Sequence, residues 1–152
     1  MPRAILIRRR SVAAAMVTLL VGACNSGGGD TANPSPILTV RDSFDGGMDA
    51  LTSGRLTIRD GCVFLVYDNL TKAVVWPTGT RLVSAEDALE LADGRTLPNG
   101  ASLEIDGGSV PYAEALTTFA SDPSSEAKAC AERADLPTVF VADSDPSAVS
   151  VL

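Results

Sequence analysis

Short segments rich in β-branched and aromatic residues, separated by tight-turn signals, occupy the middle of this 152-residue chain. Leu56 and Ile58 alternate with polar residues up to Asp60-Gly61, and a dense apolar run follows from residue 62 to residue 67. An Asp-Gly pair between two such runs is the sequence signal of a β-hairpin. The stretch therefore predicts two antiparallel strands that meet at residues 60–61.

Further segments of the same kind follow along the chain. Residues 73–76 predict a strand that stops at Pro77. Two segments, residues 88–94 and 102–108, alternate apolar and acidic residues, and each ends in a predicted glycine turn. The residues predicted to face inward are Leu89, Leu91, Leu103 and Ile105, and those predicted to face outward are Glu90, Glu104 and Asp106. Residues 138–143 predict one more strand near the C-terminus.

One segment near the C-terminus has a helical pattern. Asp122 is the expected N-cap, with Pro123 at the first helical position and Pro137 beyond the end. Helical spacing places three small residues on one face: Ala127, Cys130 and Ala131. Residues 111–120 fit either a strand or a helix, and we favour a short helix. The whole pattern predicts a mainly β fold, a small barrel or curled antiparallel sheet with one short C-terminal helix.

The N-terminus has the organisation of a targeting segment. Three arginines at residues 8–10 precede an apolar run from Ser11 to Ala23. As a helix this run would be about 20 Å long, short of the roughly 30 Å hydrocarbon core of a bilayer. A buried core helix would show polar residues at helical period, and only Thr18 interrupts residues 12–23. Residues 1–23 therefore predict a secretory signal peptide.

The last four residues of this run, Val21-Gly22-Ala23-Cys24, resemble the lipobox of bacterial lipoproteins. The resemblance implies that the Cys24 thiol receives a diacylglyceryl group and that cleavage makes Cys24 the first mature residue. Two or more acyl chains are enough for stable anchoring, whereas one chain is marginal. The implied location is the extracytoplasmic side of the cell membrane. The alternative is plain secretion, with Cys24 as an incidental thiol.

Residues 24–36 have the composition of a flexible tether, since they contain three consecutive glycines and two prolines. Such a tether reaches about 20 Å. The remainder, residues 37–152, is long enough for one β-rich domain of ordinary size. The sequence therefore predicts a signal peptide, a tether and a single domain.

Two cysteines remain after Cys24, namely Cys62 and Cys130. An even number of cysteines in an exported chain is expected to pair, and this bridge would stabilise the fold by about 4 kcal/mol. A redox-active pair is the alternative, but it favours C-x-x-C spacing or a basic neighbourhood. Only Lys128 and Arg133 near Cys130 supply the latter. We therefore predict a structural disulfide.

Charge is distributed unevenly along the chain. The net charge is −7, yet residues 1–29 carry four arginines and no acidic residue, so the rest of the chain is at −11. Nucleic-acid binding needs basic residues that displace counterions from phosphates. An acidic domain therefore predicts no nucleic-acid partner, and the expected contact with the membrane is through the lipid anchor.

The residue types exclude much of enzyme chemistry. The chain contains no histidine, which removes the commonest general base, the catalytic triads that depend on it and most zinc sites. No phosphate-binding loop, dinucleotide fingerprint or nucleophile elbow is present. We expect no cofactor and no catalytic residues. A mechanism that uses paired carboxylates, as in glycoside hydrolysis, remains open as an alternative.

Two weaker features have competing interpretations. Asp42, Asp45 and Asp49 surround a Gly-Gly pair, but their spacing does not match an EF-hand, so a solvated turn is favoured over a metal site. Trp76, the only tryptophan, is a candidate ligand contact that could stack on a sugar. Its place in an apolar strand favours a core position.

Residues 54–82, GRLTIRDGCVFLVYDNLTKAVVWPTGTRL, resemble a segment of small secreted proteins and lipoproteins of actinobacteria. A Gly-Gly pair at 107–108, a cysteine at 130 and an apolar strand after it extend the likeness. The resemblance implies a cystine-bridged β domain without an assigned activity.

The sequence as a whole predicts a membrane-anchored binding or interaction module of the cell envelope. Its ligand would be an envelope protein, a cell-wall polymer or a small molecule. The alternatives are a carboxylate-dependent enzyme acting on glycans and a structural envelope protein without a ligand.

Overall fold

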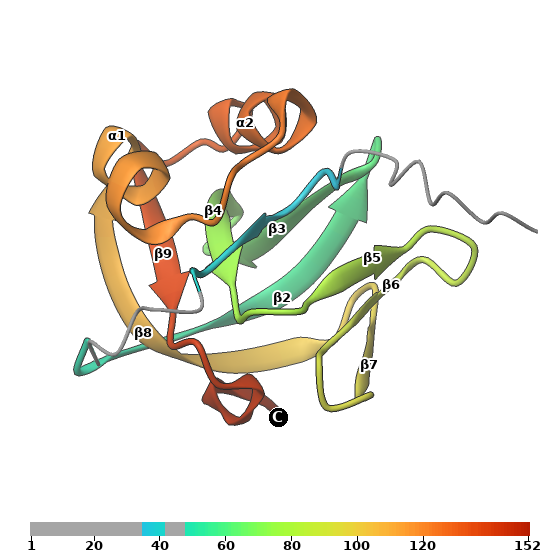
Figure 1. The fold of residues 1–152 in the computed structure, drawn as a ribbon. Helices are drawn as coiled ribbons and strands as arrows, with labels where there is room; N and C mark the ends of the chain where they lie inside the picture. The colour runs from blue at the N-terminus through green and yellow to red at the C-terminus, as the bar shows by residue number, and fades with distance from the viewer. Residues whose placement is uncertain (1–34, 42–47) are drawn as a thin grey trace, which may run out of the picture. The chain divides into compact units, whose positions relative to one another are not determined.

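A computed structural model describes residues 35–41 and 48–152 of the chain. The strands of this part are β1 (Leu38–Thr39), β2 (Ala50–Arg59), β3 (Cys62–Tyr67), β4 (Leu70–Trp76), β5 (Arg81–Val83), β6 (Ala88–Glu90), β7 (Thr96–Pro98), β8 (Ser102–Pro111), β9 (Thr138–Ala142) and β10 (Val149–Val151). The helical segments are α1 (Tyr112–Glu114), the π-helical turn η1 (Ala115–Phe119), α2 (Ser125–Glu132) and the 3-10 turn η2 (Pro146–Ala148). The described part is mainly β, as the sequence predicts (Figure 1).

Five strands close into a barrel. β2 pairs with β3 and β3 with β4, both antiparallel, and β4 then pairs with β9 in parallel. β9 pairs with β8 and β8 returns to β2, so every strand of the ring has two neighbours. This order and these directions are those of a Greek-key barrel of the oligonucleotide- and oligosaccharide-binding type. The predicted small barrel is therefore the observed fold.

Two tight turns build the first three strands of this barrel. Asp60 and Gly61 have φ angles of 50° and 73°, and Asp68 and Asn69 have φ angles of 48° and 64°. Two consecutive residues with positive φ form the turn whose twist matches that of paired strands, and Asp, Asn and Gly tolerate it best. The hairpin predicted at residues 60–61 is confirmed, and a second one follows at residues 68–69.

The barrel interior is filled by apolar side chains from all five strands. Its cluster consists of Ile37, Leu56, Val63, Leu65, Val74, Trp76, Leu89, Leu91, Leu97, Leu103, Ile105, Phe140, Ala142 and Val149. All four residues predicted to face inward from the alternating segments belong to it. Three of its leucines come from the small antiparallel sheet β5-β6-β7 and the turn that follows β6, so this sheet covers part of the interior.

β8 changes partners at a pair of glycines. Residues 102–107 pair with β2 and residues 107–111 pair with β9, so Gly107 pairs with both strands. A side chain at Gly107 would overlap the carbonyl oxygen of Val141, and one at Gly108 would overlap the side chain of Met48. The predicted glycine turn at residues 107–108 is therefore wrong, because these glycines let the strand bend inside the barrel wall. The turn predicted at Gly94 is present, with φ 85°.

α1, η1 and α2 lie on the outer face of β4 and β9, as Figure 1 shows. Residues 112–119 are helical, which confirms the preference for a helix at residues 111–120. The N-cap of α2 is Ser124, not Asp122, because the Ser124 hydroxyl accepts the Ala127 N–H at 3.0 Å. Asp122 has φ 31° and lies outside the helix. The predicted buried face of three small residues is confirmed.

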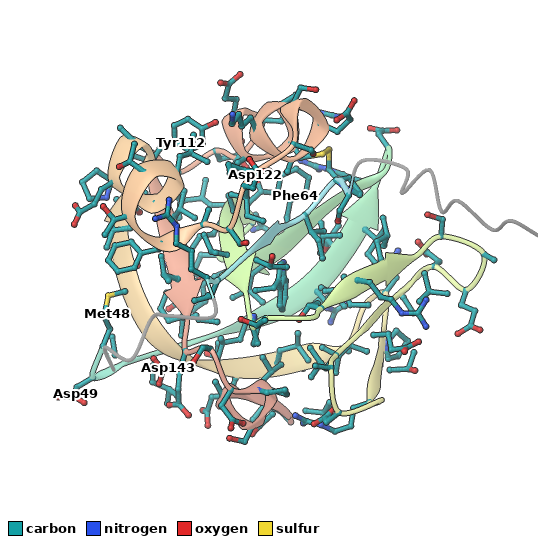
Figure 2. The ribbon with its side chains drawn as sticks, viewed as in Figure 1. Met48, Asp49, Phe64, Tyr112, Asp122 and Asp143 are labelled. Carbon is teal, nitrogen blue, oxygen red and sulfur yellow. A yellow bond between two sulfur atoms is a disulfide. The ribbon has the colours of Figure 1, made fainter. Side chains whose placement is uncertain are left out.

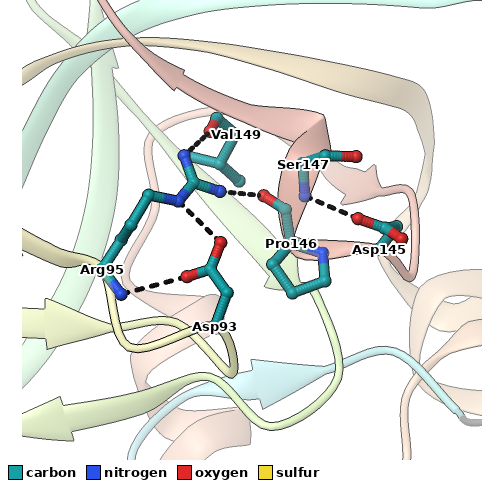
Figure 3. A network of polar contacts seen from close by, with 6 residues as sticks. All are labelled: Asp93, Arg95, Asp145, Pro146, Ser147 and Val149. Atoms are coloured by element: carbon teal, nitrogen blue, oxygen red, sulfur yellow. Dashed lines mark hydrogen bonds and ion pairs between the residues drawn. The ribbon is translucent and has the colours of Figure 1, made fainter.

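A network around Arg95 joins the small sheet to the C-terminal segment (Figure 3). The Arg95 guanidinium donates to the carbonyl oxygens of Val149 at 2.7 Å and Pro146 at 2.6 Å. Asp93 holds the guanidinium through its carboxylate, 2.7 Å from Nε. Asp145 accepts the Ser147 N–H at 2.7 Å and caps η2. These bonds fix β10 at the edge of the sheet that contains the barrel.

A search of the described residues finds no helix whose length and apolar character would suffice to cross a bilayer.

Candidate functional site

A surface groove of about 760 Å³ lies on the described part of the chain. Its walls are the β2–β3 turn, α2, β5 and the first described residues of the chain. Its lining consists of Ser35, Pro36, Asp60, Gly61, Cys62, Arg81, Leu82, Ser84, Glu126, Ala129, Cys130 and Arg133. This volume lies in the range of small-molecule binding sites.

A disulfide joins two walls of the groove. Cys62 is the first residue of β3, Cys130 lies in α2, and their sulfur atoms are 2.07 Å apart across a sequence separation of 68 residues. The bond is visible in yellow beside α2 in Figure 2. The pairing predicted from the cysteine count is therefore the pairing in the structure. Cys62 is 2% exposed and Cys130 is 9% exposed.

Arg133 connects the end of α2 to the hairpin turn across the disulfide. It is the C-cap residue of α2, and its Nη2 lies 3.1 Å from a carboxylate oxygen of Asp60. Its Nη1 donates to the sulfur of Cys62 at 3.3 Å. One guanidinium therefore contacts both the turn and one sulfur of the bridge.

The opposite wall carries a second arginine and a free strand edge. Arg81 on β5 binds Glu90 on β6 through both carboxylate oxygens, at 2.7 and 2.8 Å from Nη2. Within the described residues, β5 pairs only with β6, so its other edge has no strand partner. An unpaired edge presents N–H and C=O groups that another extended chain can use. This free edge belongs to β5. Two residues of β5, Arg81 and Leu82, line the groove.

Two residues just before β1 form part of the groove wall. Ser35 and Pro36 line it, and the next residue, Ile37, is buried in the barrel core. The Ser124 hydroxyl donates to the carbonyl oxygen of Ser35 at 2.6 Å, which fixes this segment against the start of α2. Residues 35 and 36 therefore lie at the rim of the groove.

α2 lies over the outer face of β3 and β4. Its buried residues Ala127, Cys130 and Ala131 present little apolar area, so polar bonds contribute to its attachment. Just after the helix, the Asp135 carboxylate accepts both the N–H and the hydroxyl of Thr71 on β4, at 2.8 and 2.6 Å. These two bonds lower the pKa of Asp135, because they favour the charged carboxylate.

α2 covers a surface that barrels with this strand order use for binding. In oligonucleotide- and oligosaccharide-binding barrels, ligands lie on the face of the second and third barrel strands. The corresponding strands here are β3 and β4, and their outward-facing Phe64, Ala73 and Val75 are all buried. The groove lies at the rim of this covered face.

The carboxylates of the groove do not have the environment of a catalytic acid. The groove contains Asp60, which is bound to Arg133, and Glu126. A general acid of a glycosidase needs a raised pKa, which apolar burial supplies. Asp60 and Glu126 are both solvent-exposed, so neither is buried among apolar side chains.

The remaining predicted site residues lie elsewhere. Trp76 is 0% exposed and packed inside the barrel, so it is not a surface ligand contact, and the core position is confirmed. Its Nε1 has no hydrogen-bond partner among the described residues. Cys24, Asp42 and Asp45 lie outside the described residues, and Asp49 is exposed. Among residues 35–41 and 48–152, no three potential metal-ligating side chains gather at one point.

Comparisons with protein-family models, with curated proteins and with solved structures give no match to this chain. The groove and its residues therefore rest on this structure alone.

The sequence predicted the disulfide but not the groove around it. Asp60 and Arg133 are 73 residues apart, and each is within three residues of a bridged cysteine. Once Cys62 and Cys130 are paired, these two charges must come close together, so this part of the site was within reach of the sequence. Arg81 lies on a separate sheet that only the tertiary fold brings to the groove.

Proposed function

We propose that this protein is a lipid-anchored, extracytoplasmic binding module of the cell envelope that holds an extended polypeptide segment of a partner protein in the groove. The observation that carries the proposal is the free edge of β5 in a strand that borders a groove of about 760 Å³. Strand addition to such an edge gives affinity through main-chain hydrogen bonds, and side chains beside the edge give specificity.

The groove suits a peptide with polar side chains. Arg81 and Arg133 stand on different walls, each next to a carboxylate, so both signs of charge line the groove. Leu82, Pro36 and Ala129 supply apolar contacts between them. An arginine already paired with one carboxylate retains further N–H donors, and it can bind a second carboxylate or a peptide carbonyl.

The anchor predicted at Cys24 fits this place for a ligand site. Ser35 lies on the groove, 11 positions after Cys24 in the sequence. An extended chain of this length spans at most about 40 Å. An anchored domain would therefore present its groove close to the membrane surface, where segments of neighbouring envelope proteins are concentrated.

The acidic charge and the covered barrel face argue against nucleic acids as ligands. The chain beyond residue 29 carries a net charge of −11, which repels a phosphate backbone. The ring of five strands alone carries no functional conclusion, because one fold hosts many functions. The glycan-acting enzyme has no support from the carboxylates of the groove.

Membrane attachment is tested first. Cys24→Ala in cells should remove acyl labelling and move the protein from the membrane fraction to the soluble exported fraction. Cys130→Ala is the control, because it removes a different cysteine and should leave the protein on the membrane. Unchanged membrane fractionation of the Cys24 variant would contradict the anchor.

Peptide binding is tested with a photo-crosslinking residue in native membranes. Placed at Leu82 in the groove, it should give a discrete adduct that protease treatment degrades, whereas the exposed position Asp106 on β8 should give none. Ala129→Trp should block the adduct by filling the groove, and Ala113→Trp, on the exposed side of α1, should not. An adduct that resists protease, or equal adducts at both positions, would rule out a peptide ligand in the groove.

A further inference from the structure

The disulfide of the groove has two chemically different sulfurs. The Cys62 sulfur accepts a hydrogen bond from the Arg133 guanidinium at 3.3 Å, and it begins a strand. The Cys130 sulfur belongs to the last turns of α2, which ends at Glu132. The two sulfurs therefore differ in how well each would carry a negative charge.

Arg133 favours a thiolate at Cys62. A guanidinium within hydrogen-bond distance stabilises an anionic sulfur. Asp60 accepts from the same guanidinium at 3.1 Å, but it is exposed and contacts Nη2, while Nη1 faces the sulfur. The charge on Arg133 thus remains available to Cys62.

The position of Cys130 in α2 has the opposite effect. The carbonyl groups at the C-terminal end of a helix carry partial negative charge, which disfavours an anion there. The helix also carries Glu126, Lys128 and Glu132, which together give it a net negative charge. Cys130 is the more exposed of the two cysteines, and its wall of the groove includes Ala129, whose small side chain leaves space.

We propose that the bridge is a thiol-exchange site with a fixed direction: an external low-molecular-weight thiol adds to Cys130, and Cys62 is the leaving sulfur. The thiolate of the external thiol attacks the Cys130 sulfur and forms a mixed disulfide. The bond between the two protein sulfurs breaks, and its electron pair leaves with Cys62 as a thiolate beside Arg133. One disulfide and one thiolate are consumed and one of each is formed, so no other oxidant or reductant takes part.

Exchange would loosen one wall of the groove. Without the bridge, α2 keeps the small buried faces of Ala127 and Ala131 and the bonds between Asp135 and Thr71 just beyond its end. The modification therefore gives this protein a means of changing the shape of its groove in response to thiols. This inference does not depend on the ligand proposed above, because it rests on the bridge and Arg133 alone.

The experiment uses the full processed chain in detergent, with the bridge oxidised and reduced glutathione as the probe. Acid quenching and alkylation trap the products, and trypsin separates the two cysteines into residues 60–72 and 129–133. We expect glutathione on Cys130 and the alkylating group on Cys62. Glutathione on Cys62, or equal amounts on both, would overturn the proposal without any variant.

The rate of thiol exchange tests whether Arg133 stabilises the leaving sulfur of Cys62. Arg133→Gln should slow the exchange about threefold to tenfold, and Arg133→Lys should retain part of the rate. Arg81→Gln, which removes a groove arginine that does not touch the sulfur, should leave the rate unchanged. Asp60→Asn, which removes the ion pair but not the contact with sulfur, should not slow it. Equal rates for wild type and Arg133→Gln would refute the role.

A urea series distinguishes thiol attack on the folded protein through the groove from attack that requires unfolding. In the native protein the exchange rate should not change between zero and low urea, and hydrogen exchange in the glutathione adduct should rise in α2 but not in β9. A rate that follows global unfolding as urea increases would show that the bridge is closed to thiols in the folded protein, and the proposal would be wrong.

Discussion

Two pieces of structure cover the barrel, and they are held in different ways. The small sheet β5-β6-β7 and its turn place Leu89, Leu91 and Leu97 in the barrel core, and each of these leucines is at most 1% exposed. α2 covers the outer face of β3 and β4 with two buried alanines and a bridged cysteine. Figure 1 shows the two coverings on different sides of the strands.

The difference shows which covering can move. Burying a leucine contributes about 1.5–3 kcal/mol, so the three leucines hold the sheet by apolar burial. The alanine side chains of α2 contribute about 0.8 kcal/mol for each buried methyl group, so the helix depends on its disulfide and on the bonds between Asp135 and Thr71. A covering that depends on one covalent bond can be released by chemistry at that bond.

The largest expected effect comes from removing the bridge. Cys62→Ala combined with Cys130→Ala should lower the free energy of unfolding by about 4 kcal/mol, because the unfolded chain loses a constraint over 68 residues. Urea unfolding measures the loss. Hydrogen exchange should show α2 opening before β6. If α2 remained as protected as the barrel strands, apolar packing would hold the helix and the comparison would fail.

A slightly smaller loss of stability is expected from a core substitution in the small sheet β5-β6-β7. Leu97→Ala should lower the free energy of unfolding by about 3 kcal/mol, because it leaves a cavity in the core at a position 1% exposed. Leu70→Ala is the control, since Leu70 is 45% exposed and should change stability by less than about 1 kcal/mol. Equal effects in urea unfolding would mean that the small sheet does not close the core.

The smallest expected effect is the pH dependence of the hydrogen bonds between Thr71 and Asp135, just beyond the end of α2. In the folded state the pKa of Asp135 lies below the ordinary value for an aspartate, because Thr71 donates two hydrogen bonds to the carboxylate. A lowered pKa stabilises the folded state above the unfolded pKa and ceases to do so as pH falls through the folded value.

The difference in the free energy of unfolding between wild type and Asp135→Asn should therefore be constant near pH 6. It should shrink below about pH 4 and stop changing once the pH is below the folded-state pKa of Asp135. Urea unfolding at each pH measures it. Thr71→Val, which removes the hydroxyl donor, should reduce the same pH dependence. A difference that grows toward low pH would contradict the assigned direction.

Elements with local signals were predicted well. The turn at residues 60–61, the alternation in residues 88–91 and 102–105, and the buried face of α2 follow from backbone and side-chain preferences that act over a few residues. The N-cap was misplaced by two residues, because both Asp122 and Ser124 can cap and only the path of the chain selects one. The pair Gly107-Gly108 was taken for a turn, because glycine gives the same signal in a turn and in a bent strand.

The amino-acid sequence by itself determined the β class, the pairing of the two cysteines and the alternation that fills the core. These follow from local periodicity and from the number of available partners. Only the tertiary structure decided which strands close the ring, that β4 and β9 run parallel, and that α2, β5 and the turn at Asp60 enclose one groove. Those features join residues that are dozens of positions apart, and contacts at such distances depend on the packing of the whole domain rather than on any short stretch of chain.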